Sequence, residues 1–240
     1  MSKVDIKQLL EAGAHFGHKT SRWHPKMGAY IHSKRGGSHI IDLTKTVEKL
    51  EEAQKFIEKI SAGGRQILLV GTKRQAKEII NNAAEETKMP YVTQRWVGGL
   101  LTNSETINKR IKHLKELEQK MASGALEAKY SKLEVQKFQE EIDSMNYLYG
   151  GVKHMSDKPG VLFVTDIIAD RNAVREARKI NVPIVAIVDS NGDPSLADYP
   201  IPANDDATGS IQLITQYIVE AIKSGKQAET TKSKDKEKEK

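Results

Sequence analysis

The stretch from Val182 to Ile214 decides the fold: V-P-I-V-A-I-V-D-S-N-G-D-P-S-L-A-D-Y-P-I-P-A-N-D-D-A-T-G-S-I-Q-L-I. Its apolar run, Ile184 to Val188, is β-branched and lacks polar alternation, which is typical of a parallel strand buried on both faces. After a cluster of turn-forming residues, the run from Tyr199 to Ala203 carries two prolines and predicts an edge strand. The stretch ends in a predicted helix. Its apolar positions recur at three- and four-residue steps: Ile211, Ile214, Ile218 and Ile222.

Strand and helix patterns alternate on the N-terminal side of this stretch. Buried strands are predicted at Ile67–Val70 and Val161–Val164, and a brief strand at Tyr91–Thr93. Helices are predicted at Gln75–Ala84 and Ala173–Ile180. Units of this length predict an α/β fold, a doubly wound parallel sheet with helices on both faces.

One segment interrupts this alternation. Thr102-Asn103-Ser104-Glu105 has the pattern of a capping box and predicts the start of a helix. Two helices follow, and the apolar residues of each recur at heptad spacing: Ile107, Ile111, Leu114, Leu117 and Met121, then Val135, Phe138, Ile142, Met145 and Tyr149. Residues 104–149 are therefore predicted to be an inserted antiparallel coiled-coil helical hairpin.

The remaining chain, residues 1–103 and 150–225, is predicted to form the α/β domain. Its N-terminal part has the pattern of a short amphipathic helix followed by a β-hairpin around Arg35-Gly36-Gly37, where glycines accept positive φ. Asp42 or Thr44 is expected to cap the next helix. Residues 226–240 are low-complexity Lys, Glu, Thr and Ser sequence without an apolar anchor, which predicts a disordered tail.

The composition excludes several classes of protein. The 240 residues contain no Cys, which excludes disulfides, iron–sulfur ligation and thiolate zinc sites and fits a cytoplasmic location. No apolar run approaches the roughly 18 residues of a membrane span. The net charge of +6 favours polyanionic partners.

The charges are unevenly distributed along the chain. Residues 1–45 hold eight Lys and Arg against three acids, and five of the seven His. In contrast, no Lys or Arg lies between Lys179 and Lys223, a region that contains Asp189, Asp193, Asp198, Asp205 and Asp206. This acidic stretch is expected to lack a nearby cation and so to face a basic protein surface or a metal ion.

Three catalytic or ligand-binding alternatives have an ordinary structural explanation. Val70-Gly71-Thr72-Lys73 resembles a phosphate-binding loop but lacks its first glycine, so an ordinary βα turn is favoured. His15 and His18 could share a face as metal ligands, but a polar loop without metal is favoured because no further ligands can be assigned. Asp166 and Asp189 end buried strands, where doubly wound enzymes keep their sites, but Asp also ends strands as a turn former.

Two Arg-Trp pairs favour RNA as the polyanion. Arg22-Trp23 and Arg95-Trp96 combine a phosphate-binding cation with a ring that can stack on an unpaired base. The alternative is that both Trp side chains are core anchors.

Six ordered motifs resemble the bacterial small-subunit ribosomal protein S2 family. They are G-A-H-F-G-H-K-T with W-H-P-K-M, H-I-I-D-L-T-K-T, L-L-V-G-T-K-R-Q-A, R-W-V-G-G-L-L-T-N, V-A-I-V-D-S-N-G-D-P and P-A-N-D-D-A, and the resemblance spans residues 6 to 222. The chain departs from the family at 33–38, the tip of the hairpin. The resemblance implies a flavodoxin-like sheet, contacts with 16S rRNA and other small-subunit proteins, and a role in holding ribosomal protein S1.

The resemblance and the charge pattern together give a candidate set of functional residues. The expected RNA-binding residues are Lys19, Arg22, Trp23, Lys26, Lys34, Arg35, Lys73, Arg74, Arg95, Trp96, Asn103, Lys109, Arg110 and Lys112. The expected protein-binding residues are Asp189, Asp193, Asp205 and Asp206. No catalysis, cofactor, metal, membrane or small-molecule substrate is expected. A phosphotransfer enzyme and a free-standing RNA-binding regulator are the remaining alternatives.

Overall fold

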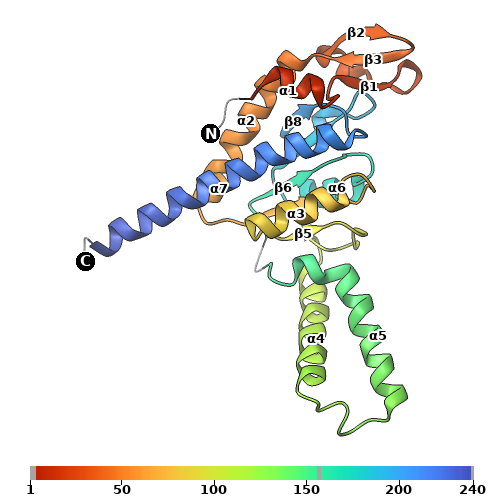
Figure 1. Ribbon diagram of the computed structural model, residues 1–240, viewed down its shortest axis with the longest axis vertical. Coiled ribbons are helices and arrows are strands. Elements are labelled where there is room, and N and C mark those ends of the chain that lie inside the picture. The colour runs from red at the N-terminus through yellow and green to blue at the C-terminus, as the bar shows by residue number, and fades with distance from the viewer. Residues whose placement is uncertain (1–3, 156–157, 239–240) are drawn as a thin grey trace.

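The centre of the fold is a five-stranded parallel sheet (Figure 1). It is seen in a computed structural model that describes residues 4–155 and 158–238. The strands lie in the order β5-β4-β6-β7-β8, and each neighbouring pair is parallel. Their bounds are β4 Ile67–Val70, β5 Tyr91–Val92, β6 Val161–Val164, β7 Ile184–Val188 and β8 Tyr199–Pro202. In chain order this is 2-1-3-4-5, the flavodoxin-like order, so the predicted α/β sheet is confirmed.

Helices cover both faces of the sheet. Alternate strand residues point to opposite faces, so Leu69 of β4 joins a core under α1, α2, α3 and α7, while Leu68 joins a core under α6 and the base of the helical hairpin. The helix bounds are α1 Ile6–Glu11, α2 Leu43–Ala62, α3 Lys77–Thr87, α6 Arg171–Lys179 and α7 Thr208–Lys238. Burial on both faces explains why β6 and β7 carry no polar alternation.

A second, three-stranded sheet lies beyond the β8 edge of the large sheet (Figure 1). It is antiparallel in the order β1-β3-β2, with β1 Phe16–Lys19, β2 Ile31–Arg35 and β3 Ser38–Ile41. Gly36 and Gly37 have φ values of 57° and 79°, which confirms the predicted hairpin turn. Two 3-10 turns, η1 Thr20–Arg22 and η2 Pro25–Tyr30, connect β1 to β2. Asp42 caps α2 as expected, accepting a hydrogen bond from the Thr44 backbone N–H at 2.9 Å.

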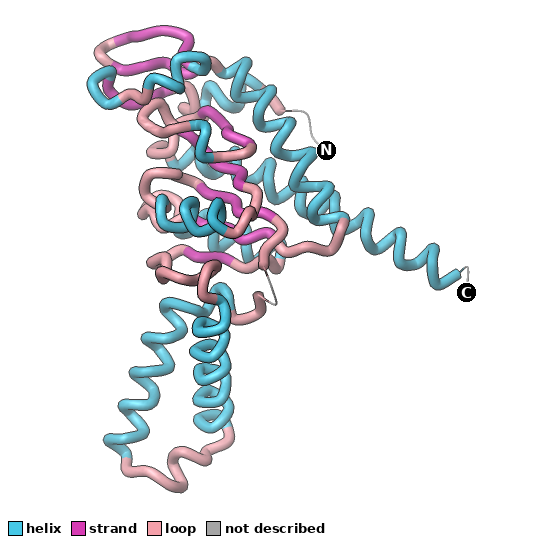
Figure 2. The backbone as a smooth tube through the Cα atoms, turned by 180° about the vertical axis from the view of Figure 1, so that it is seen from behind, coloured by secondary structure: helices cyan, strands magenta, loops and turns pink. Residues whose placement is uncertain are grey.

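The inserted helical hairpin projects from the opposite, β5 end of the large sheet (Figures 1 and 2). Helix α4 spans Ser104–Ala122, α5 spans Lys132–Tyr149, and the 3-10 turn η3, Gly150–Val152, returns the chain to the sheet. The hairpin is confirmed, but continuous coiled-coil packing is not established. The two helices diverge toward the tip of the hairpin (Figures 1 and 2). Leu126, which belongs to the loop that connects them, is buried.

The predicted capping box at the start of α4 is wrong. The helix begins at Ser104 as predicted, but its N-cap Asn103 makes no side-chain capping bond. The Thr102 hydroxyl instead donates to Glu176 Oε2 at 3.2 Å, because the loop before α4 is bound to α6. The capping box of the hairpin lies at α5, where Ser131 and Glu134 satisfy each other.

The last helix extends farther than the sequence pattern predicts. Its apolar face, which includes Ile214, Ile218 and Ile222, packs on α2 and the sheet as expected. The tail predicted to be disordered from residue 226 lies in this helix as far as Lys238, and residues 239–240 lie outside the described residues. Lys, Glu, Gln and Ala are good helix formers, and no proline interrupts them, so the helix has no local reason to end. No helix in the described ranges is long and apolar enough to cross a membrane.

We predict that the α/β domain folds without the hairpin. Helices α4 and α5 pack mainly on each other and on η3. Deleting residues 104–148 and joining the ends with a short glycine linker keeps the buried Tyr149 and should leave one cooperative urea-unfolding transition, followed by circular dichroism beside the full chain. A broad, non-cooperative transition in the shortened chain would show that the hairpin is an integral part of the core.

Candidate nucleic-acid interface and carboxylate cluster

The carboxyl edge of the large sheet gathers acidic side chains from distant parts of the chain. Because the strands are parallel, the segments that follow β4, β6, β7 and β8 all leave the sheet at this edge. Asp166 follows β6, Asp189 follows β7, and Asp205 and Asp206 follow β8. We call these four aspartates the carboxylate cluster.

Lys73 lies at the centre of this cluster. Its Nζ is 3.2 Å from Asp166 Oδ2, 2.8 Å from Asp205 Oδ1 and 2.6 Å from Asp206 Oδ1. Lys73 follows β4, and β4 and β6 flank the point where the strand order of a flavodoxin-like sheet reverses, the usual place for a ligand. Here a lysine and its carboxylates occupy that point, which supports the ordinary βα turn over the phosphate-binding loop.

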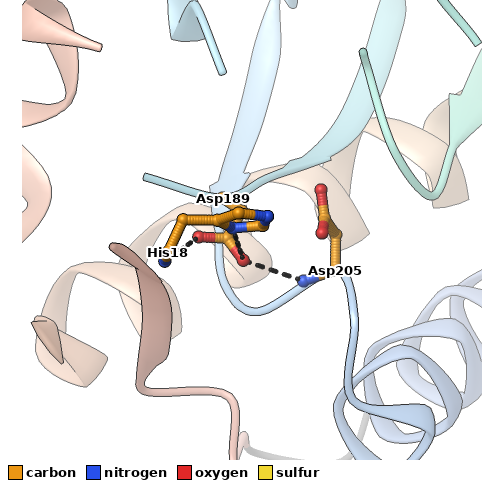
Figure 3. A group of neighbouring side chains, drawn as sticks. All are labelled: His18, Asp189 and Asp205. Carbon is orange, nitrogen blue, oxygen red and sulfur yellow. Dashed lines mark hydrogen bonds and ion pairs between the residues drawn. The ribbon is translucent and has the colours of Figure 1, made fainter. Parts of the chain in front are cut away.

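His18 of β1 joins the cluster from the small sheet. Its Nδ1 is 3.1 Å from Asp189 Oδ2 (Figure 3). Its Nε2 is 3.4 Å from Asp206 Oδ2. Its backbone N–H donates to Ser190 Oγ at 2.8 Å. A side chain at the neighbouring Gly17 would come within 2.8 Å of Ser190 Oγ, so glycine allows β1 to approach the end of β7. These contacts dock the small sheet on the large one.

Burial and mutual repulsion perturb the acids of this edge. Burial, with the nearby charges of Asp166 and Asp189, raises the pKa of Asp205 to about 7. Burial also raises the pKa of Asp170 to about 6, although Thr72 donates two hydrogen bonds to its carboxylate. Burial opposes the charge of Lys73, but hydrogen bonds to Asp205 and Asp206 outweigh it and raise the pKa of Lys73. The hydrogen bond to Asp189 raises the pKa of His18.

The expectation that the acidic stretch lacks a nearby cation is wrong. Lys73 and His18 contact the cluster, and Lys26 Nζ lies 2.8 Å from Asp193 Oδ2. Hydrogen bonds from Lys26 and Ser195 outweigh burial and lower the pKa of Asp193 to about 2. These cations are far away in sequence, so a scan of neighbouring positions could not find them. Asp189 and Asp205 are buried, which leaves Asp193 and Asp206 as the more accessible of the four predicted protein-binding residues.

The structure gives structural roles to the other residues that were considered as catalytic or metal-binding. Asp166 Oδ1 accepts the backbone N–H groups of Ile168 and Ala169 at 2.7 and 2.9 Å, the turn role expected of a strand-ending Asp. His15 does not join His18 in the cluster. Its ring contacts that of Phe16, with centroids 3.9 Å apart, and burial lowers its pKa.

The predicted RNA-binding residues form two groups at opposite ends of the large sheet. The first group lies on the small sheet and its turns, and all its members are exposed: Lys19, Arg22, Trp23, Lys26, Lys34 and Arg35. Within this group the Trp23 ring lies 5.2 Å from the His39 ring, and Lys34 Nζ lies 5.8 Å from the Trp23 centroid. An exposed ring with a cation beside it suits an unpaired base and its phosphate.

The second group lies near β5 and on α4. Its exposed members are Arg95, Asn103, Lys109, Arg110 and Lys112, and Arg74 is exposed at the start of the α3 region between the two groups. Lys73 and Trp96 do not fit the prediction. Lys73 is surrounded by carboxylates, and Trp96 is only 7% exposed, so the core-anchor alternative describes Trp96.

Glu176 of α6 organises the loop that carries the second group. Its carboxylate accepts hydrogen bonds from Trp96 Nε1 at 3.0 Å and from the backbone N–H groups of Gly99, Leu101 and Thr102 at 2.7, 3.0 and 3.2 Å. These bonds outweigh burial and lower the pKa of Glu176. The sequence analysis missed this residue. The only local signal is that a buried Trp96 would need an acceptor for its indole N–H.

Taken together, these features define a flavodoxin-like α/β protein whose carboxyl-edge polar groups make structural contacts and whose predicted RNA-binding cations are mostly exposed. Comparison with known proteins specifies the class. The family model described as "Ribosomal protein S2" matches residues 9–225, so the chain belongs to the ribosomal protein S2 family, whose members are structural constituents of the small ribosomal subunit. The chain is 50% identical over 227 residues to the small ribosomal subunit protein uS2 of Coprothermobacter proteolyticus, covering 95% of this chain and 84% of that protein.

We predict that Glu176→Gln loosens the loop between β5 and α4. An amide replaces a charged acceptor and introduces donors facing donors, so stability should fall by no more than about 3 kcal/mol. Because the pKa of Glu176 lies below its ordinary value of 4.5 in the folded chain, the loss should be full above pH 4.5 and shrink as the pH falls through the folded pKa.

Hydrogen exchange and urea unfolding at several pH values test this prediction. The amides of Gly99, Leu101 and Thr102 should exchange faster in the variant. Glu116→Gln, a change on the exposed face of α4, is the matched control and should behave as the unmodified chain. Equal exchange rates in both variants would show that Glu176 does not hold the loop.

Proposed function

We propose that this chain binds 16S rRNA along the carboxyl side of its large sheet, from the small sheet at one end to the hairpin base at the other. The single observation that supports this best is exposure: twelve of the fourteen candidate residues are exposed, all but Lys73 and Trp96. Arg and Lys side chains of this kind bind phosphates and fix register, whereas exposed rings stack on unpaired bases. We take the polyanion to be RNA because the chain belongs to a family of small-subunit ribosomal proteins.

The distribution of charge supports the same surface. The acids of the carboxyl edge pair with Lys73, His18 and Lys26. In contrast, Lys19, Arg22, Lys34 and Arg35 are exposed and make no ion pair among the described residues. Internal pairing of the acids reduces the repulsion that an RNA backbone would meet, because paired charges produce a weaker field than isolated ones. The acidic stretch therefore does not prevent RNA from approaching this side.

We predict that Lys19, Arg22, Lys34 and Arg35, changed together to Ala, weaken binding to a 16S rRNA fragment and flatten its salt dependence. Each lost phosphate contact removes about 0.9 from the slope of log affinity against log salt on duplex, or about 0.7 on single strands. Titrations at several salt concentrations measure the slope.

A matched variant removes the same charge elsewhere. Lys7, Lys45, Lys55 and Lys59 are exposed on α1 and α2, and changing them to Ala should alter the slope little. Equal slopes for the two variants would mean that binding responds to net charge alone and that the small sheet is not the contact surface.

We also infer from the family that the chain helps to hold ribosomal protein S1 on the small subunit. Among the described residues of the acidic stretch, the two more accessible predicted protein-binding carboxylates are already paired: Asp206 is bound by Lys73 and lies beside His18, and Asp193 is bound by Lys26. We therefore predict that Asp206→Asn subunits retain S1 at the unmodified level, as measured by sedimentation and quantification of S1 on purified subunits. Loss of S1 from fully assembled variant subunits would make the acidic stretch the dock after all.

A further inference from the structure

The imidazole of His39 is buried in the small sheet without a hydrogen bond. His39 lies in β3 and is 0% exposed, yet neither its Nδ1 nor its Nε2 has a partner among the described residues. Buried polar atoms are almost always paired, and an apolar ring would fill this place without leaving two polar atoms unsatisfied. The fold therefore does not need an imidazole here, and its two nitrogens indicate a partner from outside the chain.

The ring that covers His39 is that of Trp23. The two ring centroids are 5.2 Å apart, with an interplanar angle of 32°. The Trp23 side chain is 39% exposed, and its indole N–H makes no hydrogen bond within residues 4–155 and 158–238. In contrast, the buried indole of Trp96 donates to Glu176 at 3.0 Å. No hydrogen bond therefore holds the Trp23 ring over His39.

The backbone beside Trp23 is fixed. The backbone N–H of His24 donates to the Ser190 carbonyl oxygen at 2.7 Å, and that of Met27 donates to the His24 carbonyl oxygen at 2.9 Å. On the η2 side, the ring faces Gly28, where even an added Cβ would lie 3.7 Å from the indole. Rotation about the side-chain bonds of Trp23 can therefore uncover His39 while the main chain stays in place.

We propose that Trp23 and His39 form a binding site for one unpaired base of a single-stranded RNA segment. In the complex, the indole of Trp23 swings off the imidazole and stacks on the base, and His39 hydrogen-bonds to the edge of the base. This inference rests on the proposed RNA contact of the small sheet. It adds a buried residue that touches a base, whereas the exposed cations of the sheet bind phosphates.

The chemistry of a neutral imidazole suits this role. One ring nitrogen donates and the other accepts, and the edge of an unpaired base offers both acceptors and donors. Burial, together with the charge of Lys34, which is paired with His39 across β2 and β3, lowers the pKa of His39. His39 therefore stays neutral at pH 7 and keeps both functions.

Cations for the neighbouring phosphates lie beside the same ring. Lys34 Nζ is 5.8 Å from the Trp23 centroid, and the exposed Arg22 directly precedes Trp23 in the chain. Bases that stack on aromatic rings while the backbone follows basic groups are typical of single-strand binding. A duplex hides the base edges that His39 would contact, so the partner is a loop, a bulge or an end of the RNA.

Binding of short single-stranded oligonucleotides of adenosine, cytidine and uridine to the full chain, at several salt concentrations, tests the proposal. Trp23→Leu should weaken the tightest of these complexes by roughly 5- to 150-fold through loss of stacking. His39→Phe should weaken it by roughly 2- to 12-fold through loss of the hydrogen bond. Neither change removes a phosphate contact, so the salt slope should stay the same.

Two controls separate this role of His39 from a structural one. His15→Phe removes another buried and unpaired imidazole nitrogen, from a ring that contacts Phe16, and should leave the affinity unchanged. In urea unfolding, His39→Phe should be at least as stable as the unmodified chain, because it removes two unsatisfied polar atoms. In the unmodified chain labelled with ¹⁵N, the oligonucleotide should shift the His39 imidazole and Trp23 indole nitrogens and leave the Trp96 indole in place.

An unchanged affinity in His39→Phe, or an unshifted His39 ring in the saturated complex, would overturn the proposal. If the variant with Lys19, Arg22, Lys34 and Arg35 changed to Ala still flattens the salt slope in that case, the proposed RNA surface stands and only the base contact fails. If that variant keeps the slope of the unmodified chain, the RNA surface fails and this inference fails with it.

Discussion

The ion pairs of Lys73 are the interaction on which the carboxyl edge of the sheet depends. One ammonium contacts carboxylates from the segments after β6 and β8, and the Lys73–Asp205 pair joins residues 132 positions apart. Removing one partner of a fully buried ion pair typically costs about 3–5 kcal/mol. The cost should be smaller here, because Lys73 is 20% exposed and Asp206 52% exposed. Doubly wound proteins commonly bind their ligand at this edge. Here Lys73 and its carboxylates occupy the ligand position, and their ion pairs connect the segments that follow β4, β6 and β8.

The same pairing separates the two signs of charge. The acids that cluster in sequence turn inward, toward cations supplied by the small sheet and by the turn after β4. The exposed cations that are predicted to bind RNA lie on the small sheet and near the hairpin base, with Arg74 between them. A chain of modest net charge can thus present a locally basic surface beside this edge, because the acids of the edge are paired within the chain. For a constituent of the small ribosomal subunit, this arrangement is consistent with the phosphate contacts that we propose.

Near the β5 end of the sheet, Glu176 of α6 also connects segments that are distant in sequence, as Lys73 does after β4. A single carboxylate accepts hydrogen bonds from the indole of Trp96 and from three backbone N–H groups of the loop that leads into α4. Charge-assisted hydrogen bonds of this kind are stronger than neutral ones and hold a loop that would otherwise be mobile. The direction in which the hairpin leaves the domain is therefore set by α6, to which the hairpin is not connected in sequence.

The sequence by itself determined the elements: the buried strands, the glycine turn of the small sheet, a helix cap at Asp42 or Thr44, and the paired helices of the hairpin. These follow from local periodicity and turn chemistry, which act over a few residues. It also indicated most of the exposed cations. Only the tertiary structure decided that the acidic stretch is paired, that Trp96 is a core anchor and that Glu176 holds the loop. Each of these depends on groups that parallel strands and crossing helices bring together from distant positions, and no local pattern records which strand ends will meet.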